Sequence, residues 1–347
     1  MIEILEDSTP KRWDDIVTSF HNYDVYYLSG YVKAFKLNGD GEPLLIYAQY
    51  NGTRCIIVVF KRAIETNISD VSLYDLITPY GYGGFLFDGN DNEHNKQIIF
   101  NEIFNYLKDA NVISLFIRWH PILSNVLQSK NIIESINIGS TIDMQLSDKE
   151  TIWNNFTSKN RNTIRNAIKK GVIIKQSDSI DLFDTFVNIY NETMLRDNAS
   201  KYYYFPKDFY TSIARDMKGK YTIFYANLDN QIISMSIIIY ANRFMHYHLS
   251  GTKSSYRNYN PTNLLLYEAA QWGHSKGFTN FHLGGGVGAT EDNLYKFKKA
   301  FNRNLSNEFC ISKIIINHDI YSRLVNERML VDKAFDLDSS FFPLYRS

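Results

Sequence analysis

The sequence predicts an α/β protein with two tandem domains, each a mixed β-sheet flanked by helices. Its 347 residues exceed the size of one ordinary hydrophobic core. Both halves follow the same order of elements, with helices, a hairpin, a further strand, a helix and closing strands. A capping box at 147–150, with Ser147 as the expected N-cap, marks the start of the second half. We therefore expect domains over 1–146 and 147–333, followed by a C-terminal tail over 334–347.

Local signals predict the elements of the first half. Thr9 and Pro10 are typical of a helix N-cap and first helical residue, and Asn51-Gly52 is the strongest short-range signal for a hairpin turn. The predicted elements are helices over 10–20, 29–36 and 94–111, and strands over 43–50, 53–61, 71–76 and 112–119, with a last strand ending near Leu146.

Local signals also predict the elements of the second half. Gly171 stands just past a helix end, Pro206 and Pro261 each open a helix, and Asp229-Asn230 turns a hairpin. The predicted helices cover 158–170, 180–196, the segments after Pro206, Pro261 and Asn293, and 319–333; the predicted strands cover 172–176, 221–227, 231–240, 244–249, 278–283 and 309–316.

Composition limits the class of protein. Lysine plus arginine and aspartate plus glutamate both number 37, so any contact with a polyanion must come from local clustering. Cys55 and Cys310 lack metal-ligand spacing and lie in apolar runs, as expected of core residues in a reducing compartment. No apolar segment approaches the ~20 residues needed to span a bilayer. We expect a cytoplasmic protein without a transmembrane segment and without a bound metal.

Residues 159–175 form a one-sign basic run that contains no acidic residue. Arg161, Arg165 and Lys169 recur at every fourth position, on one face of the predicted helix. Like charges at this spacing repel one another, so an anionic partner would stabilise the helix. A solvated basic face is the alternative interpretation.

The segment 278–301 combines a short apolar strand, three glycines and an amphipathic helix. Gly284 and Gly285 allow close approach of the backbone to a ligand, and the helix sets Lys298 beside Phe297. This pattern predicts a close approach of the backbone to a ligand at the end of the strand, followed by a helix with one apolar and one cationic face. An ordinary glycine turn before a solvated lysine helix is the alternative.

Histidines and aromatic residues supply further candidates. His248 shares a strand face with His246; no carboxylate or cysteine stands at a supporting spacing, so a metal site is not predicted. Rings with polar tips suit a substrate groove, and the chain contains 25 Tyr and 23 Phe. The glycine-rich loop over 78–84 contributes Tyr80 and Tyr82, and a ring-rich stretch contributes Tyr204. We expect Tyr80 and Tyr82 to line an acceptor groove.

Four stretches together resemble the FemABX-type peptidoglycan aminoacyltransferases and their shorter GNAT-like cell-envelope relatives. They are residues 159–172, 247–252, 283–286 and 293–301. The resemblance implies two tandem GNAT-like domains that transfer an aminoacyl group from tRNA, or an acyl group from another carrier, to an amine. The acceptor that it implies is a nucleotide- or lipid-linked precursor of the cell wall or of a surface polysaccharide.

The resemblance also assigns expected roles. Phe297 and Lys298 match positions at the donor end and in acyl transfer, and Lys33 matches a residue that contacts the phosphates of the precursor. His248 is the chemical candidate for a general base, because imidazole titrates near neutral pH. The expected substrate-binding residues are Lys33, Tyr80, Tyr82, Arg161, Arg165, Tyr204, Arg257, Gly284 and Gly285.

The identity of the acyl donor separates the two enzymatic alternatives. The stretch 256–261 lacks the glycines that let a GNAT backbone wrap the coenzyme A pyrophosphate, which favours aminoacyl-tRNA over acyl-coenzyme A as co-substrate. Arg257 and the amides near Asn263 keep a coenzyme A-dependent N-acyltransferase of an amino sugar or small amine open. A non-catalytic module that binds a nucleotide-sugar or RNA is the alternative from another class. No tightly bound cofactor is expected.

Overall fold

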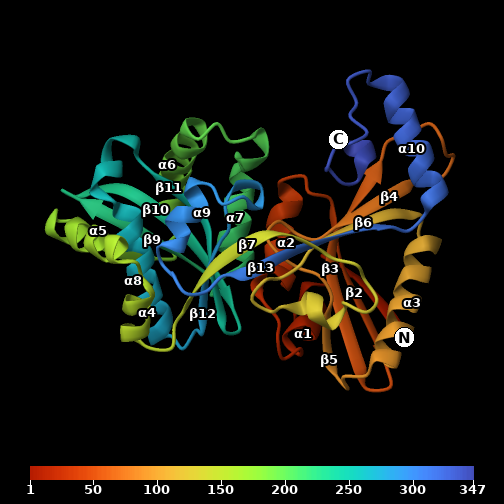
Figure 1. Cartoon of the computed structure of the whole chain (residues 1–347), viewed down its shortest axis with the longest axis horizontal. Helices are drawn as coiled ribbons and strands as arrows, with labels where there is room; N and C mark the ends of the chain where they lie inside the picture. Colours follow the sequence, from red (N-terminus) through yellow and green to blue (C-terminus); the bar gives the residue numbers. More distant parts are fainter. The chain divides into compact units, whose positions relative to one another are not determined.

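The computed structural model describes residues 1–347 and divides into two compact units. The first unit consists of Met1–Ile138 and Phe309–Ser347, and the second consists of Gly139–Glu308. Each unit is a mixed β-sheet flanked by helices, so the predicted α/β fold class is confirmed (Figure 1).

The sheet of the first unit contains seven strands, six of them in the order β1-β2-β3-β4-β6-β13. Every neighbouring pair is antiparallel except β4 and β6, which are parallel, and β5 pairs separately with β3. The strands are β1 (Ile2–Glu6), β2 (Glu42–Tyr50), β3 (Thr53–Ile64), β4 (Leu73–Ile77), β5 (Leu86–Gly89), β6 (Val112–Arg118) and β13 (Asn307–Ile315).

Helices cover both faces of this sheet because its strands carry apolar residues on both sides. Helix α3 (Glu93–Asp109) packs Phe100 and Ile103 in one core with Ile57 of β3. Val58 is also buried and points to the opposite face, where α2 (Ser29–Leu37) packs against β2. The remaining helices of the unit are α1 (Pro10–Thr18) and α10 (His318–Val331).

The sheet of the second unit contains six strands in the order β7-β12-β11-β10-β9-β8. Here too one neighbouring pair, β11 with β12, is parallel and the other pairs are antiparallel. The strands are β7 (Ile136–Gln145), β8 (Ile173–Ser177), β9 (Tyr221–Leu228), β10 (Gln231–Ala241), β11 (Phe244–Thr252) and β12 (Asn280–Gly284).

Helices again lie on both faces of the sheet. Helix α8 (Pro261–Ser275) contributes Leu265 and Ala269 to a core that it shares with Ile164 of α5 (Ser158–Lys169). Helix α6 (Leu182–Arg196) packs against β10 and β11, and its Phe186 lies edge-on to Tyr210 of α7 (Lys207–Asp216). The two other helices are α4 (Lys149–Asn155) and α9 (Asn293–Lys299).

The two sheets have the same topology, and each takes its sixth strand from the other half of the sequence. Strand β7 follows β6 along the chain but pairs with β12. Strand β13 follows β12 but pairs with β6. The structural units therefore divide at 138/139 and 308/309, which differs from the expected boundary at 146/147 and returns α10 and the C-terminal tail to the first unit.

Most predicted elements form, and the local differences have simple causes. The Asn51-Gly52 turn joins β2 and β3, with both residues at positive φ. Asp148 rather than Ser147 caps α4, because its carboxylate accepts from the Thr151 amide at 2.7 Å. Two short strands, β1 and β5, were not predicted from the sequence. Six 3-10 turns complete the fold: Val25–Tyr27, Asn125–Gln128, Lys201–Tyr203, Ser254–Tyr259, Val287–Ala289 and Leu344–Arg346.

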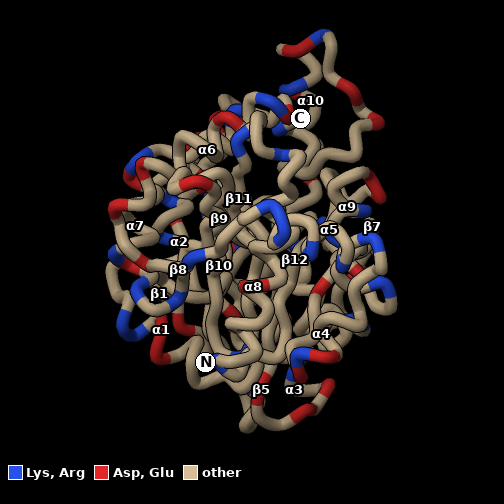
Figure 2. The backbone as a smooth tube through the Cα atoms, turned by 90° about the vertical axis from the view of Figure 1, so that its left-hand side faces the viewer, with Lys and Arg blue, Asp and Glu red and all other residues tan.

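Charge is mixed over the molecule. Basic and acidic segments alternate along the backbone, and neither sign dominates (Figure 2), as the equal totals of 37 require. None of the helices combines the length and the apolar character needed to cross a membrane.

Candidate active site

The parallel pair of the second unit separates part-way along its strands. Strand β11 runs for nine residues, but only Phe244, Met245 and His246 pair with β12. The last matched pair is His246 with His282, whose rings meet edge-to-face at 5.6 Å. Beyond that pair, β11 continues alone on this side to Thr252, while β12 ends in glycine. Just beyond His246 the backbone of β11 therefore has no ladder partner in β12, although further along the Thr252 amide donates to Thr193 Oγ1.

A β-bulge lies where the strands separate. The register between β10 and β11 shifts between Ile237 and Ile238, which oppose Leu249 and Tyr247. His248 is thus the extra residue of β11. Bulges re-aim side chains and interrupt pairing, and they are over-represented next to active sites.

Glycines at the end of β12 bring the backbone close to other main-chain atoms. Gly284 has φ +78°, in the left-handed region that favours glycine. A Cβ at Gly286 would lie 2.0 Å from the Thr290 carbonyl oxygen and 2.4 Å from an Asp292 carboxylate oxygen. The loop after β12 therefore closes tightly on itself and directs its carbonyl groups toward α9.

Lys298 of α9 is buried under this loop. Its Nζ donates to the Gly285 carbonyl oxygen at 2.7 Å, and the residue is 8% exposed. Burial lowers the pKa of Lys298 to about 8, and the nearby Asp292 carboxylate partly opposes this shift. The side chain is still mostly protonated at neutral pH, so a positive charge is held in a poorly solvated position beside the glycine loop.

Asp292 connects the loop to the helix. Its carboxylate caps α9 by accepting from the Tyr295 amide at 2.8 Å, and it also accepts from the Val287 amide at 3.1 Å. These backbone hydrogen bonds, the Tyr295 bond foremost, lower the pKa of Asp292. Asp292 therefore fixes the start of α9, the helix that carries Lys298.

Phe297 and His248 complete the predicted catalytic set. Phe297 is half-buried and packs its ring on Phe301 at 5.5 Å, which orients α9 on the core. Burial, followed by the influence of His246, lowers the pKa of His248 to about 3. An imidazole with that pKa is neutral at pH 7 but holds a proton poorly, which makes His248 a weak general base.

Comparison with known proteins agrees with this geometry. Residues 158–299, which run from the start of α5 to the end of α9, match the family model of the acetyltransferase (GNAT) domain. This segment is a GNAT acyltransferase domain. No curated protein sequence matches the chain.

Solved structures give the fold of the whole chain. FemX aligns with a TM-score of 0.70 at 15% identity, covering 92% of this chain and 99% of FemX. A domain assigned to lysylphosphatidylglycerol synthetase from Agrobacterium fabrum gives 0.57 at 11% identity, with 93% and 96% coverage. L-PGS from Bacillus licheniformis gives 0.56 at 14% identity, with 94% and 98% coverage. The expected tandem GNAT-like fold is confirmed, and the chain resembles FemX over almost its full length.

A helix starts beside the end of β11 in the GNAT domain, where the hydroxyl groups of Thr252 and Thr262 form a hydrogen bond at 2.9 Å. Helix α8 begins at Pro261 after Asn260, which has φ +52° and gives no side-chain cap to the helix. The preceding 3-10 turn (254–259) presents Arg257 as an exposed residue. Lys170 donates to the Asn258 carbonyl oxygen at 2.7 Å and holds this turn. Backbone amides at an uncapped helix start are suited to bind an anion.

The basic helix α5 lies against α8, with its arginines engaged to different degrees. Arg161 Nη1 donates to the Phe156 carbonyl oxygen at 2.5 Å. Arg165 is exposed, and its guanidinium lies 5.1 Å from the Trp153 ring centroid. Tyr204, also exposed, follows the 3-10 turn 201–203. Arg165 and Tyr204 therefore remain accessible to a ligand of the GNAT domain.

Three predicted binding residues belong to the first unit. Lys33 is a half-buried residue of α2. The Tyr80 ring stacks on Phe35 at 5.3 Å, and the Tyr82 ring meets Tyr26 edge-on at 5.6 Å. The tyrosines are thus held by aromatic packing within this unit.

Two features of the GNAT domain were not predicted from the sequence. Asp292 caps α9, and an aspartate directly before a predicted helix is a recognisable N-cap signal in the sequence. The bulge at His248 has no local signal, because it depends on the register with β10.

Proposed function

We propose that this protein transfers an acyl or aminoacyl group to an amine on a precursor of the cell wall or of a surface polysaccharide. The observation that carries the proposal is the buried Lys298 ammonium, held against the Gly285 carbonyl at the end of β12. A preorganised positive charge in a poorly solvated site stabilises developing negative charge far better than the same charge in water.

The chemistry needs few protein groups. The neutral acceptor amine attacks the carbonyl carbon of the donor ester or thioester, a C–N bond forms, and the carbonyl oxygen becomes an oxyanion. The C–O or C–S bond then breaks, and the proton lost by the amine balances the departing alkoxide or thiolate. Lys298 is the catalytic residue that stabilises this charge, and Phe297 orients its helix. His248 lies at the bulge of β11, and its proposed role is to position the substrate rather than to transfer a proton.

Aminoacyl-tRNA is the proposed donor. The stretch before Pro261 lacks glycine, whereas positive charge is spread over 159–175 and 296–303. An extended polyanion makes use of such dispersed contacts. Arg161, Arg165, Tyr204 and Arg257 are the proposed donor contacts, and Gly284 and Gly285 provide the close backbone approach. Lys33, Tyr80 and Tyr82 are proposed to bind the acceptor.

Acyl-coenzyme A is the second candidate donor, and a specific observation favours it. Helix α8 has no side-chain cap at its start, so its first amides are available to a pyrophosphate beside Arg257. An N-acyltransferase of an amino sugar or small amine would use the same Lys298.

Thermal-shift titration separates the candidates, because a ligand that prefers the folded state raises the apparent stability by mass action. The purified chain is titrated with acetyl-coenzyme A, with charged tRNA and with nucleotide-linked wall precursors. Saturable stabilisation by charged tRNA and by a precursor is the expected result. Stabilisation by micromolar acetyl-coenzyme A, with none from tRNA, would overturn the donor assignment. A response to nucleotide-sugar or RNA without any transfer product would favour a non-catalytic binding module.

A further inference from the structure

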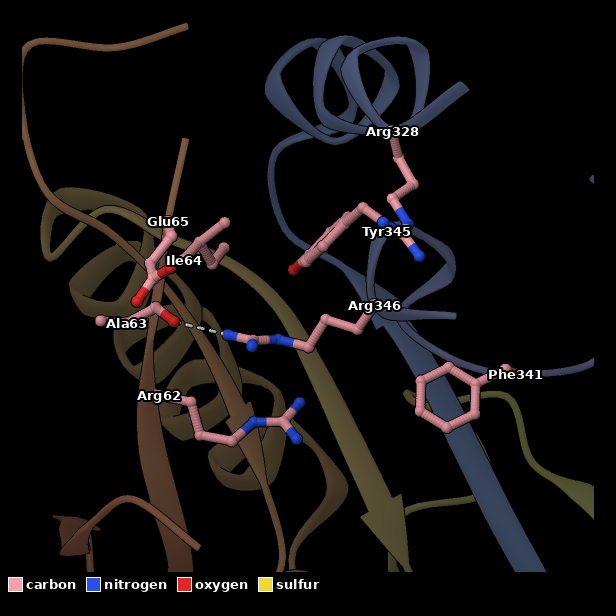
Figure 3. A pocket seen from close by; sticks show the side chains of 8 residues that line it. All are labelled: Arg62, Ala63, Ile64, Glu65, Arg328, Phe341, Tyr345 and Arg346. Atoms are coloured by element: carbon pink, nitrogen blue, oxygen red, sulfur yellow. Dashed lines mark hydrogen bonds between the residues drawn. The ribbon is translucent and has the colours of Figure 1, made fainter. Parts of the chain in front are cut away.

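Three arginines line a cavity in the first unit, outside the GNAT domain. The cavity has a volume of about 550 Å³. It lies between the end of β3, helix α10 and the last residues of the chain, as the labelled side chains show (Figure 3). The polar and aromatic side chains that line it are Arg62, Glu65, Arg328, Phe341, Tyr345 and Arg346.

Two of the arginines share one buried carboxylate. Asp75 is fully buried, and its two oxygens accept from Arg62 Nε at 2.6 Å and from Arg346 Nε at 2.5 Å. Tyr345 donates a further hydrogen bond to Asp75 at 3.3 Å. Asp75 thus supplies one negative charge to two guanidinium groups, whose side chains it holds at the cavity wall.

The arginines keep unused donors. Arg62 bonds only through Nε, so both of its terminal nitrogens lack a protein acceptor. Arg346 Nη2 donates to the Ala63 carbonyl oxygen at 2.6 Å, which leaves Nη1 available. Arg328 is paired with Asp332 at 2.9 Å and also donates to the Ser347 oxygen at 3.0 and 3.2 Å, so it is already occupied. Glu65, which is exposed and forms no ion pair, is the acidic residue that lines the cavity.

We propose that this cavity is an anion site for a phosphate-bearing ligand. A planar guanidinium matches the oxygens of a phosphate, and the buried Asp75 fixes the Arg62 and Arg346 forks before a ligand arrives. The Phe341 ring, 52% exposed, gives the rim an apolar surface. The volume holds more than a single phosphate, so a diphosphate or a phosphate attached to a larger group is the ligand class. The site is independent of the transfer chemistry.

Isothermal titration of the full chain with inorganic pyrophosphate tests the proposal. We expect saturable binding that Arg62→Gln weakens about tenfold or more, because a hydrogen-bonded charge pair is lost. Glu65→Gln removes a competing negative charge and should tighten binding about twofold. Glu65 is exposed, so this variant should keep the fold. Arg215→Gln, which changes an exposed arginine paired with Asp216 in the other unit, is the control and should leave affinity unchanged.

A second experiment distinguishes a lipid headgroup from a soluble phosphate as the ligand. Vesicles of phosphatidylglycerol in phosphatidylcholine are sedimented with wild-type chain and with Arg62→Gln. Co-sedimentation that Arg62→Gln abolishes supports the site with a lipid headgroup as ligand. Pyrophosphate binding without vesicle binding supports it with a soluble phosphate. The proposal is overturned if neither probe binds saturably, or if both Arg62→Gln and Glu65→Gln leave affinity unchanged.

Discussion

The two units share one topology but differ at the matching parallel pair. In the GNAT domain, pairing of β11 with β12 stops at His246 and His282, and β11 continues alone. In the first unit, pairing of β4 with β6 continues to Ile77 and Phe116 at the end of β4. The parallel pair is therefore open in the GNAT domain, where β11 extends beyond its pairing with β12, and closed in the first unit, where β4 is paired to its end.

In the first unit, further hydrogen bonds join the two chain segments beyond the end of β4. The Thr78 amide donates to the Phe116 carbonyl oxygen, and the Arg118 amide donates to Thr78 Oγ1, both at 3.0 Å. Gly83 then bridges to Trp119. In the GNAT domain the ladder between β11 and β12 ends at His246 and His282. A shared sheet topology therefore does not create a site by itself, because a site depends on particular residues and their geometry.

We expect the largest effect on the transfer rate from replacing Lys298. Lys298→Met should lower the transfer rate by about 100-fold or more, the scale for removing one preorganised oxyanion stabiliser. Its melting temperature should be unchanged or higher, because the variant removes a buried charge. Single-turnover rates and thermal melts measure both. Lys296→Met, an exposed lysine of the same helix, is the control. Equal rates in the two variants would contradict the role of Lys298.

The open and closed pairs also show what the sequence can predict. The Asn51-Gly52 hairpin, the helix starts at Pro206 and Pro261 and the glycine end of β12 follow from local chemistry, and all of them form. The exchange of β7 and β13 did not follow, because strand pairing joins residues distant in sequence. The same holds for the separation after His282, since register is a property of two strands together. The pKa of His248 depends on burial, which the alternating pattern of β11 did not reveal.

A change in the closed pair should affect stability rather than catalysis. Thr78→Val leaves the buried Arg118 amide without its acceptor and should cost about 1–3 kcal/mol in the free energy of unfolding. The transfer rate at saturating acceptor, measured well below the melting temperature, should change by less than about twofold, because Thr78 is not a proposed catalytic or donor-binding residue. Thr18→Val, at an exposed threonine of the same unit, is the matched control. A loss of rate as large as that of Lys298→Met would contradict the comparison.

The protonation state of Lys298 should make the transfer rate of the GNAT domain depend on pH. Burial lowers its pKa to about 8, so the active ammonium is lost above that pH. Lys298→Arg stays charged throughout. The ratio of wild-type to Lys298→Arg rates should therefore fall about tenfold between pH 7 and pH 9, and the ratio removes the titration of the acceptor amine.

Stability should move in the opposite direction over the same range. The folded chain binds fewer protons at Lys298 than the unfolded chain between pH 8 and about 10.5. The contribution of this residue to the free energy of unfolding thus rises as pH increases through that window. Denaturant titrations of wild type and Lys298→Met check the sign, and a difference that is constant with pH would contradict it.

The smallest expected effect concerns the basic helix beside the open pair. Replacing Arg161 and Arg165 with Gln should weaken tRNA binding several-fold and reduce its salt dependence by about one to two ionic contacts. Stability should fall by about 0.5–1.5 kcal/mol through the lost bond from Arg161 to the Phe156 carbonyl, whereas the exposed Arg165 contributes about 0–1 kcal/mol. Affinity is measured by fluorescence anisotropy at several salt concentrations, with Lys218→Gln as a control for an exposed lysine outside α5. If both affinity and salt slope match the control, α5 is a solvated face, and donor binding depends on the start of α8 and the glycine loop alone.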